Sequence, residues 1–168
     1  MQIETNGHRL NVIQQGPETG RPVVLLHHGL GAARSWEHTL PALAEAGYFV
    51  TAYDRWGYGQ SDPRPALDLP DFQSDVNDLA AILDQLSLHQ PVLVGHSDGG
   101  TIALYLAASA PEALAGLVTV AAHIYLEPKM IPAIQALREA YDQHAAFHKG
   151  LARLHGNQVQ QVFENWYQ

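Results

Sequence analysis

A serine between two glycines, in the segment 95–99 (Gly-His-Ser-Asp-Gly), carries the clearest chemical signal in the chain. The apolar run 91–94 precedes it, and the segment 99–104, rich in small residues, follows it. This order predicts a strand, a sharp turn and a helix, with Ser97 at the apex of the turn. A serine there adopts a strained backbone conformation that lifts its hydroxyl clear of the chain. The pattern therefore predicts a nucleophile.

A second motif, the segment 27–31 (His-His-Gly-Leu-Gly), directly follows another apolar run. An ester or amide carbonyl attacked by Ser97 becomes a tetrahedral oxyanion, which needs hydrogen-bond donors already in place. We predict that these donors are the backbone N–H groups of Leu30 and Asp98. By itself the motif is also typical of an ordinary turn with a satisfied histidine; beside the serine turn, the oxyanion role is favoured.

A serine hydroxyl is a weak nucleophile until a histidine accepts its proton and a carboxylate orients that histidine. Four histidines follow Ser97. His123 comes just after an expected strand, and we predict that it lines the substrate pocket rather than acting as the base. His144, His148 and His155 lie in helical sequence and are expected to be solvated or partly buried.

The carboxylate of Asp98 lies close to the place where negative charge would develop. It is unfavourable there unless it points away or has a cationic partner. Two interpretations stay open. Asp98 receives a substrate ammonium group, which gives a preference for amino-acid esters or amides, or it is satisfied by nearby backbone or by Arg34.

The composition excludes several classes of protein. The chain has 168 residues, a net charge of −8 and no cysteine. The charge argues against nucleic-acid partners and anionic membranes, and the lack of cysteine excludes disulfides and thiolate metal sites. We expect no cofactor and no metal. We also expect a cytoplasmic protein, because the first residues lack the pattern of a signal peptide.

Apolar runs alternate with helical patterns along most of the chain. This alternation predicts an α/β fold with a mostly parallel sheet and helices on both faces. Strands are expected at 9–13, 23–26, 48–53, 92–94 and 117–121, and helices at 35–46, 72–86, 97–110, 131–141 and 159–166. We divide the chain into a core, 1–124, and a partial helical cap, 125–168.

Three segments, at 28–29, 54–61 and 95–100, resemble the signature motifs of the α/β-hydrolase fold superfamily in type, order and separation. The likeness is closest to small-molecule esterases, aminopeptidases and C–C hydrolases. It implies that Asp54, Arg55 and Ser61 are mainly architectural, and that a helical cap, with Trp166 in it, shapes the pocket for a small ester or amide. Related dehalogenases and epoxide hydrolases carry aspartate at the nucleophile position, so a serine argues against both chemistries.

The resemblance also implies that the acid and histidine of the triad lie after two further strands, beyond the cap. We therefore expect the chain to be a C-terminally incomplete hydrolase core whose last strand, 117–121, exposes an apolar edge. Such an edge favours self-association or pairing with a complementing C-terminal chain. The alternative is a non-catalytic fold remnant, a binding module or one half of a split hydrolase.

Overall fold

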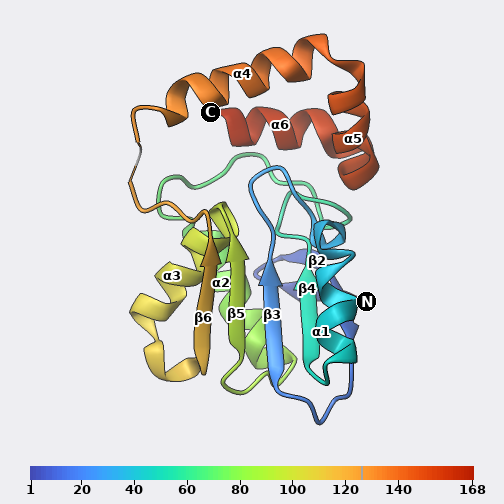
Figure 1. The fold of residues 1–168 in the computed structure, drawn as a ribbon, viewed down its shortest axis with the longest axis vertical. Coiled ribbons are helices and arrows are strands. Elements are labelled where there is room, and N and C mark those ends of the chain that lie inside the picture. The colour runs from blue at the N-terminus through green and yellow to red at the C-terminus, as the bar shows by residue number, and fades with distance from the viewer. Residues whose placement is uncertain (126) are drawn as a thin grey trace.

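A computed structural model describes residues 1–125 and 127–168. Six strands form one sheet in the order β1-β2-β4-β3-β5-β6. Helices cover both faces of this sheet, and three more helices lie over the carboxyl ends of the parallel strands (Figure 1). The predicted α/β architecture with a mostly parallel sheet is confirmed.

The expected strands are present, and the structure adds one at the N-terminus. The strands are β1 (Gln2–Thr5), β2 (His8–Gln15), β3 (Pro22–Leu26), β4 (Phe49–Tyr53), β5 (Val92–His96) and β6 (Gly116–Val120). β3 to β6 pair in parallel, whereas β1 and β2 form an antiparallel hairpin beside β4. Asn6 and Gly7 join the hairpin with φ angles of 49° and 85°. An Asn-Gly pair between two segments of alternating polar and apolar residues predicts such a two-residue turn. The sequence therefore contained a signal from which β1 could have been predicted.

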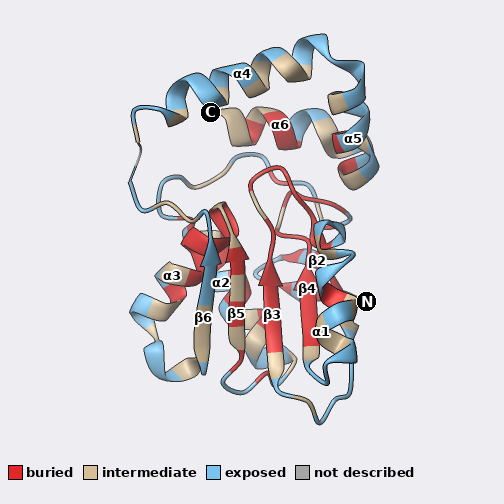
Figure 2. Cartoon of the chain, viewed as in Figure 1, coloured by how far each residue is buried: buried red, intermediate tan, exposed pale blue. Residues whose placement is uncertain are grey.

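The core has two sides because successive side chains of a strand point to opposite faces of the sheet. On β3, Val24 and Leu26 belong to the cluster that includes residues of α2 (Gln73–Gln85) and α3 (Asp98–Ser109). Val23 and Leu25 belong to the cluster that includes a residue of α1 (Thr39–Glu45). β3 is therefore buried on both faces, as Figure 2 shows, and its carboxyl end is a rigid support for the loop that follows.

The prediction of a single helix over 35–46 is wrong. The structure has a short 3₁₀ helix, η1 (Ala33–Trp36), and then α1. Pro41 explains the break, because proline has no N–H and clashes with the preceding turn inside a helix, so it is tolerated only near a helix start. Beginning α1 at Thr39 places Pro41 in its first turn.

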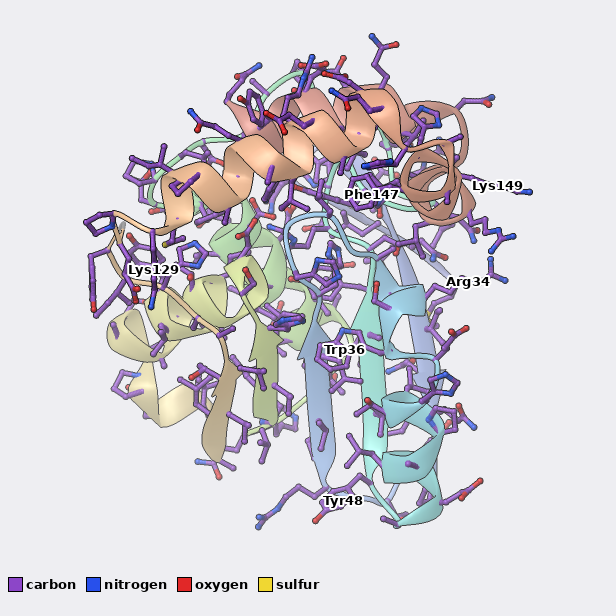
Figure 3. All side chains as sticks on the ribbon, turned by 45° about the horizontal axis from the view of Figure 1, so that its top comes forward. Arg34, Trp36, Tyr48, Lys129, Phe147 and Lys149 are labelled. Atoms are coloured by element: carbon purple, nitrogen blue, oxygen red, sulfur yellow. The ribbon has the colours of Figure 1, made fainter. Side chains whose placement is uncertain are left out.

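The segment after β6 forms the cap helices α4 (Met130–Gln143), α5 (Ala145–His155) and α6 (Val159–Tyr167). The sequence predicted the first and last of these but did not separate α5. Phe163 and Leu151 of the cap pack in one cluster with Leu30 and Tyr58 of the core, and Phe147 joins this cluster from α5 (Figure 3). Residue 126, in the predicted cap range, lies outside the described residues, and the division at 124/125 stays a prediction.

Within the described ranges, no helix combines the length and the apolar character needed to cross a membrane.

One face of β6 is left uncovered. Val118 and Val120 are each 49% exposed. Leu117 packs against the cluster shared by α2 and α3, so alternation places Val118 and Val120 on the opposite face, where α1 lies over β4, away from β6 (Figure 2). Among the residues that the structure describes, β6 pairs with β5 alone. Unpaired backbone groups and exposed valines together make this strand a surface prone to association.

We expect the isolated chain to self-associate through β6. Replacing Val118 and Val120 by lysine should shift the protein toward monomer, because a charged edge resists strand pairing and both side chains face away from the core. Sedimentation velocity over a concentration series measures the shift. Ile13 and Tyr48 are also exposed but lie far from β6. Replacing both of them by lysine is the matched control and should change the self-association little. A wild-type chain that is a monodisperse monomer and melts cooperatively would contradict this expectation.

Candidate active site

Ser97 occupies the turn between β5 and α3 with φ 52° and ψ −120°. This is the strained elbow predicted from the flanking glycines, and positive φ is uncommon for a residue with a side chain. The backbone holds the turn in place, since the Ser97 N–H donates to the Val120 carbonyl at 2.8 Å and the Ser97 carbonyl accepts from Gly100 N–H at 2.8 Å. The half-buried Ser97 therefore stands at the carboxyl end of the sheet.

The two glycines that flank the serine permit close backbone contacts. A Cβ on Gly95 would lie 2.4 Å from the Gly99 carbonyl oxygen, and a Cβ on Gly99 would lie 2.3 Å from the Leu26 carbonyl oxygen. Both approaches are too short for any side chain. The Gly99 contact brings the elbow against the end of β3, where the Leu30 loop (residues 27–31) begins.

The Leu30 loop, the elbow and the cap meet at Gly29. A Cβ on Gly29 would lie 2.6 Å from Asp98 Oδ2 and 2.0 Å from Trp166 Nε1. The Leu30 loop, the elbow and the cap are far apart in sequence, yet at Gly29 they lie too close together to admit even one added side-chain atom. The structure brings Asp98 and Trp166 together at Gly29, and Ser97 and Leu30 are the chain neighbours of Asp98 and Gly29.

The N–H of Leu30 has a side-chain acceptor. It donates to His28 Nδ1 at 3.3 Å, a long hydrogen bond. Burial, together with the neighbouring His96 and Arg55, lowers the pKa of His28 to about 4. His28 is therefore neutral at pH 7, and its ring nitrogen can act as an acceptor for this amide.

The Asp98 carboxylate is buried and lies between two basic side chains. Its Oδ2 is 3.6 Å from Arg55 Nη2, and its Oδ1 is 3.7 Å from His123 Nε2. The alternative that Arg34 pairs with Asp98 is wrong, because Arg34 is exposed on η1 and lies away from the elbow (Figure 3). His123 is one-third exposed, at the rim of the site.

Arg55 is buried between the carboxylates of Asp75 and Asp98, which fits the architectural role that the resemblance implied. Its guanidinium is 1% exposed, donates to Asp75 Oδ1 at 3.3 Å and lies 4.4 Å from the centre of the Tyr58 ring. Asp75 in turn accepts from Arg64 at 2.7 Å. This buried network ends at Asp98, so Arg55 is the cation that offsets a carboxylate next to the nucleophile. The sequence contained no local signal for this pairing.

Asp54 and Ser61 are architectural, as expected. Asp54 Oδ1 accepts from the Ala33 N–H at 2.7 Å, and Oδ2 accepts from the Gln60 N–H at 2.9 Å. The Ser61 hydroxyl donates to the Asp54 carbonyl at 2.6 Å. These bonds tie the loop after β4 to the segment that follows the Leu30 loop.

The expectation of a solvated or partly buried histidine is wrong for His155, which is 2% exposed. Its Nδ1 accepts from the Gly59 N–H at 3.0 Å, and its Nε2 lies 3.1 Å from the Leu30 carbonyl oxygen. The expectation holds for His144 and His148, which are exposed. The sequence pattern of α5 marks a helix face but does not reveal which core loop that face meets.

Within residues 1–125 and 127–168, no side chain is hydrogen-bonded to the Ser97 hydroxyl. The same residues hold no group of three or more histidine, cysteine or acidic side chains arranged for a metal ion. His123 lies beside Asp98, and within the described residues it makes no hydrogen bond to the Ser97 hydroxyl that would mark it as the base.

Comparison with known proteins agrees with the architecture. The family model described as alpha/beta hydrolase fold matches residues 22–163. The chain belongs to the alpha/beta-hydrolase fold family. The match begins at the first residue of β3 and ends in α6, so it includes the Leu30 loop, the elbow and most of the cap.

Epoxide hydrolases are prominent among the relatives of this family member. The chain is 38% identical to "Epoxide hydrolase A" of Mycobacterium tuberculosis over 146 residues, which is 84% of this chain and 44% of the relative. An epoxide hydrolase structure from Vigna radiata superposes with a TM-score of 0.69 at 30% identity, over 84% of this chain and 43% of that one. A structure described among carboxylesterases of Nitrososphaera gargenis superposes with a TM-score of 0.78 at 18% identity, covering 99% of this chain and 72% of that one, and shows the fold alone. The chain thus spans less than half the length of the curated relatives it matches.

Replacing Arg55 tests the buried charge network. Arg55→Met should destabilise the chain by about 3–5 kcal/mol, because it leaves Asp98 buried beside no guanidinium while Asp75 keeps Arg64. Urea unfolding followed by circular dichroism measures the loss. Arg9→Met is the matched control: Arg9 pairs with Asp62 on the surface, with a 64% exposed side chain, and its removal should change stability little. Equal small losses for both variants would contradict a structural role for the network.

Proposed function

We propose that this chain is the nucleophile-bearing part of a serine hydrolase that cleaves small esters or amides through a Ser97 acyl-enzyme. The observation that carries the proposal is the strained elbow, which holds Ser97 at φ 52° while Gly99 lies against the end of β3. Ser97 Oγ attacks the substrate carbonyl, and the N–H groups of Asp98 and Leu30 stabilise the resulting oxyanion. For Leu30, the oxyanion takes the place of His28 Nδ1 as acceptor.

The choice of serine bears on the reaction. A carboxylate that opens an epoxide forms an ester, which water can then hydrolyse. A serine oxygen that opens an epoxide forms an ether, which has no carbonyl for water to attack, so the enzyme would stay blocked. Ser97 therefore favours acyl transfer over the epoxide hydrolysis that the relatives' names suggest. Epoxide hydrolysis is the second candidate, favoured by the 38% identity.

Proton transfer needs a histidine and an acid. We propose that both are supplied from outside residues 1–168, by residues that correspond to the part of the relatives not covered here. In the alternative, the chain is a non-catalytic binding module that keeps the cleft without the base. In either case Asp98, His123 and Trp166 line the substrate pocket, from the elbow, the rim and the cap.

A fluorophosphonate probe tests whether Ser97 and the oxyanion donors are arranged for nucleophilic attack. We expect covalent labelling of Ser97 in the folded chain, because the oxyanion site can accelerate attack by roughly 10³–10⁴ over water even without a base. Peptide mass spectrometry locates the adduct. Ser97→Ala should abolish labelling, and Ser109→Ala, on the exposed end of α3, should not change it.

Labelling that is no faster in the folded chain than in urea would support the non-catalytic alternative. The second candidate has its own readout: the chain is incubated with styrene oxide and the diol is measured. We expect no catalytic diol formation. Turnover of the epoxide would overturn the acyl-transfer proposal.

Paired probes test whether Asp98 receives an ammonium group. Because Arg55 already offsets its charge at 3.6 Å, we expect Asp98→Asn to change labelling by an α-amino phosphonate and by its neutral analogue to the same extent, within about twofold. Stopped-assay mass spectrometry gives both rates, and a melting curve confirms that the variant is folded. A loss confined to the amino probe would assign Asp98 to ammonium recognition.

A further inference from the structure

His155 connects the cap to two loops of the core with one ring. It is the last residue of α5 and is 2% exposed. Its Nδ1 accepts from the Gly59 N–H at 3.0 Å, so Nδ1 carries no proton. Its Nε2 lies 3.1 Å from the Leu30 carbonyl oxygen, which can only accept. The two bonds therefore define one neutral tautomer, with the proton on Nε2.

The bond to Leu30 differs from the other cap contacts. Gln158 donates to the Ser61 carbonyl at 2.9 Å, and Asn165 donates to the Arg64 carbonyl at 2.9 Å. Both of these reach the loop after β4. Among the hydrogen bonds between cap and core in the described part of the chain, only that of His155 reaches the Leu30 loop.

Leu30 is held from both sides by imidazoles. Its N–H donates to His28 Nδ1, and its carbonyl accepts from His155 Nε2. Its side chain is buried with Leu151 and Phe163 of the cap. The orientation of the Leu30 backbone thus depends on the cap as well as on β3.

We propose that His155 is a positioning residue for the oxyanion donor at Leu30, and that it performs this role only in its neutral form. Protonation of Nδ1 would place two donors, the ring N–H and the Gly59 N–H, against each other at 3.0 Å. One of them would have to move, and α5 would shift against both loops. The consequence for catalysis rests on the proposed function, whereas the coupling between His155 and Leu30 does not.

The groups that face His155 keep it neutral at pH 7. Burial lowers the pKa of His155 below its ordinary value, the bond to the Leu30 carbonyl and the charge of Asp54 oppose this, and Arg55 adds to it. His27 and His28 are close enough to act on it electrostatically, and the Tyr58 ring lies 6.0 Å from the His155 ring. Because the folded pKa is below the unfolded value of about 6.5, the stabilising contact is complete above that pH. It is lost as the pH falls from there through the folded pKa.

Nuclear magnetic resonance of the full chain tests the coupling directly. At pH 7.5 we expect a scalar coupling across the hydrogen bond between the Gly59 amide nitrogen and His155 Nδ1. As the pH falls, this coupling should disappear, and the Leu30 amide resonance should shift with the midpoint of the His155 titration. A Leu30 amide that stays in place while His155 titrates would overturn the proposal.

Variants separate His155 from the nearby His28. His155→Gln keeps one acceptor and one donor but does not titrate, so the Leu30 resonance should stay near its wild-type position and lose the pH step. His155→Leu removes both bonds, and the Leu30 resonance should be displaced at every pH. His148→Gln, on the exposed side of the same helix, is the matched control and should keep the wild-type step. A step that survives in His155→Gln would assign it to His28 and overturn the proposal.

The catalytic consequence has a separate readout. Fluorophosphonate labelling of Ser97 should slow by at least about tenfold in His155→Leu, because a misdirected donor stabilises the developing charge poorly. It should recover in His155→Gln. If Ser97 is never labelled but the Leu30 step follows His155, the proposed function fails and the positioning role stands. If labelling is normal in every variant, the positioning role fails and the proposed function stands.

Discussion

Gly99 allows the start of α3 to lie directly against the end of β3. A Cβ added to Gly99 would lie 2.3 Å from the Leu26 carbonyl oxygen. β3 and β5 are neighbours in the sheet, with Leu26 in register with Gly95. These two strands therefore end side by side, and the loops that follow them lie next to each other. The convergence of Asp98, Gly29 and Trp166 follows from this contact, because any side chain at position 99 would force the elbow and the Leu30 loop apart.

Neutral histidines connect the loops around this contact. Burial lowers the pKa values of His27, His28 and His155, and each ring lies in hydrogen-bond contact with backbone groups of the surrounding loops. A further positive charge would be costly here, because the guanidinium of Arg55 is already buried nearby and like charges repel strongly at low dielectric. An imidazole supplies one donor and one acceptor without adding charge. This explains why neutral rings, and not lysines, accompany the Asp54 carboxylate in joining these segments.

The family and the reaction are decided by different parts of the molecule. The sheet, the helices and the cap carry the likeness to epoxide hydrolases, which extends over most of the chain. In the proposed function, the covalent chemistry depends on one side chain at the apex of the elbow, because the nucleophile determines whether the intermediate contains a carbonyl that water can attack. A chain can therefore share the scaffold of its relatives and differ from them in the bond it breaks.

The sequence by itself determined the elbow, the parallel strands and the helices α2 and α3, because glycine spacing, apolar runs and helical periodicity are local properties. It also placed Leu30 and Asp98 near Ser97, since loops after neighbouring parallel strands meet at one edge. Only the tertiary structure decided that Arg55 and not Arg34 pairs with Asp98, and that His155 is buried against Leu30. The His155–Leu30 bond joins residues 125 positions apart. No periodicity records such a contact, because it depends on how the cap packs on the core after both have formed.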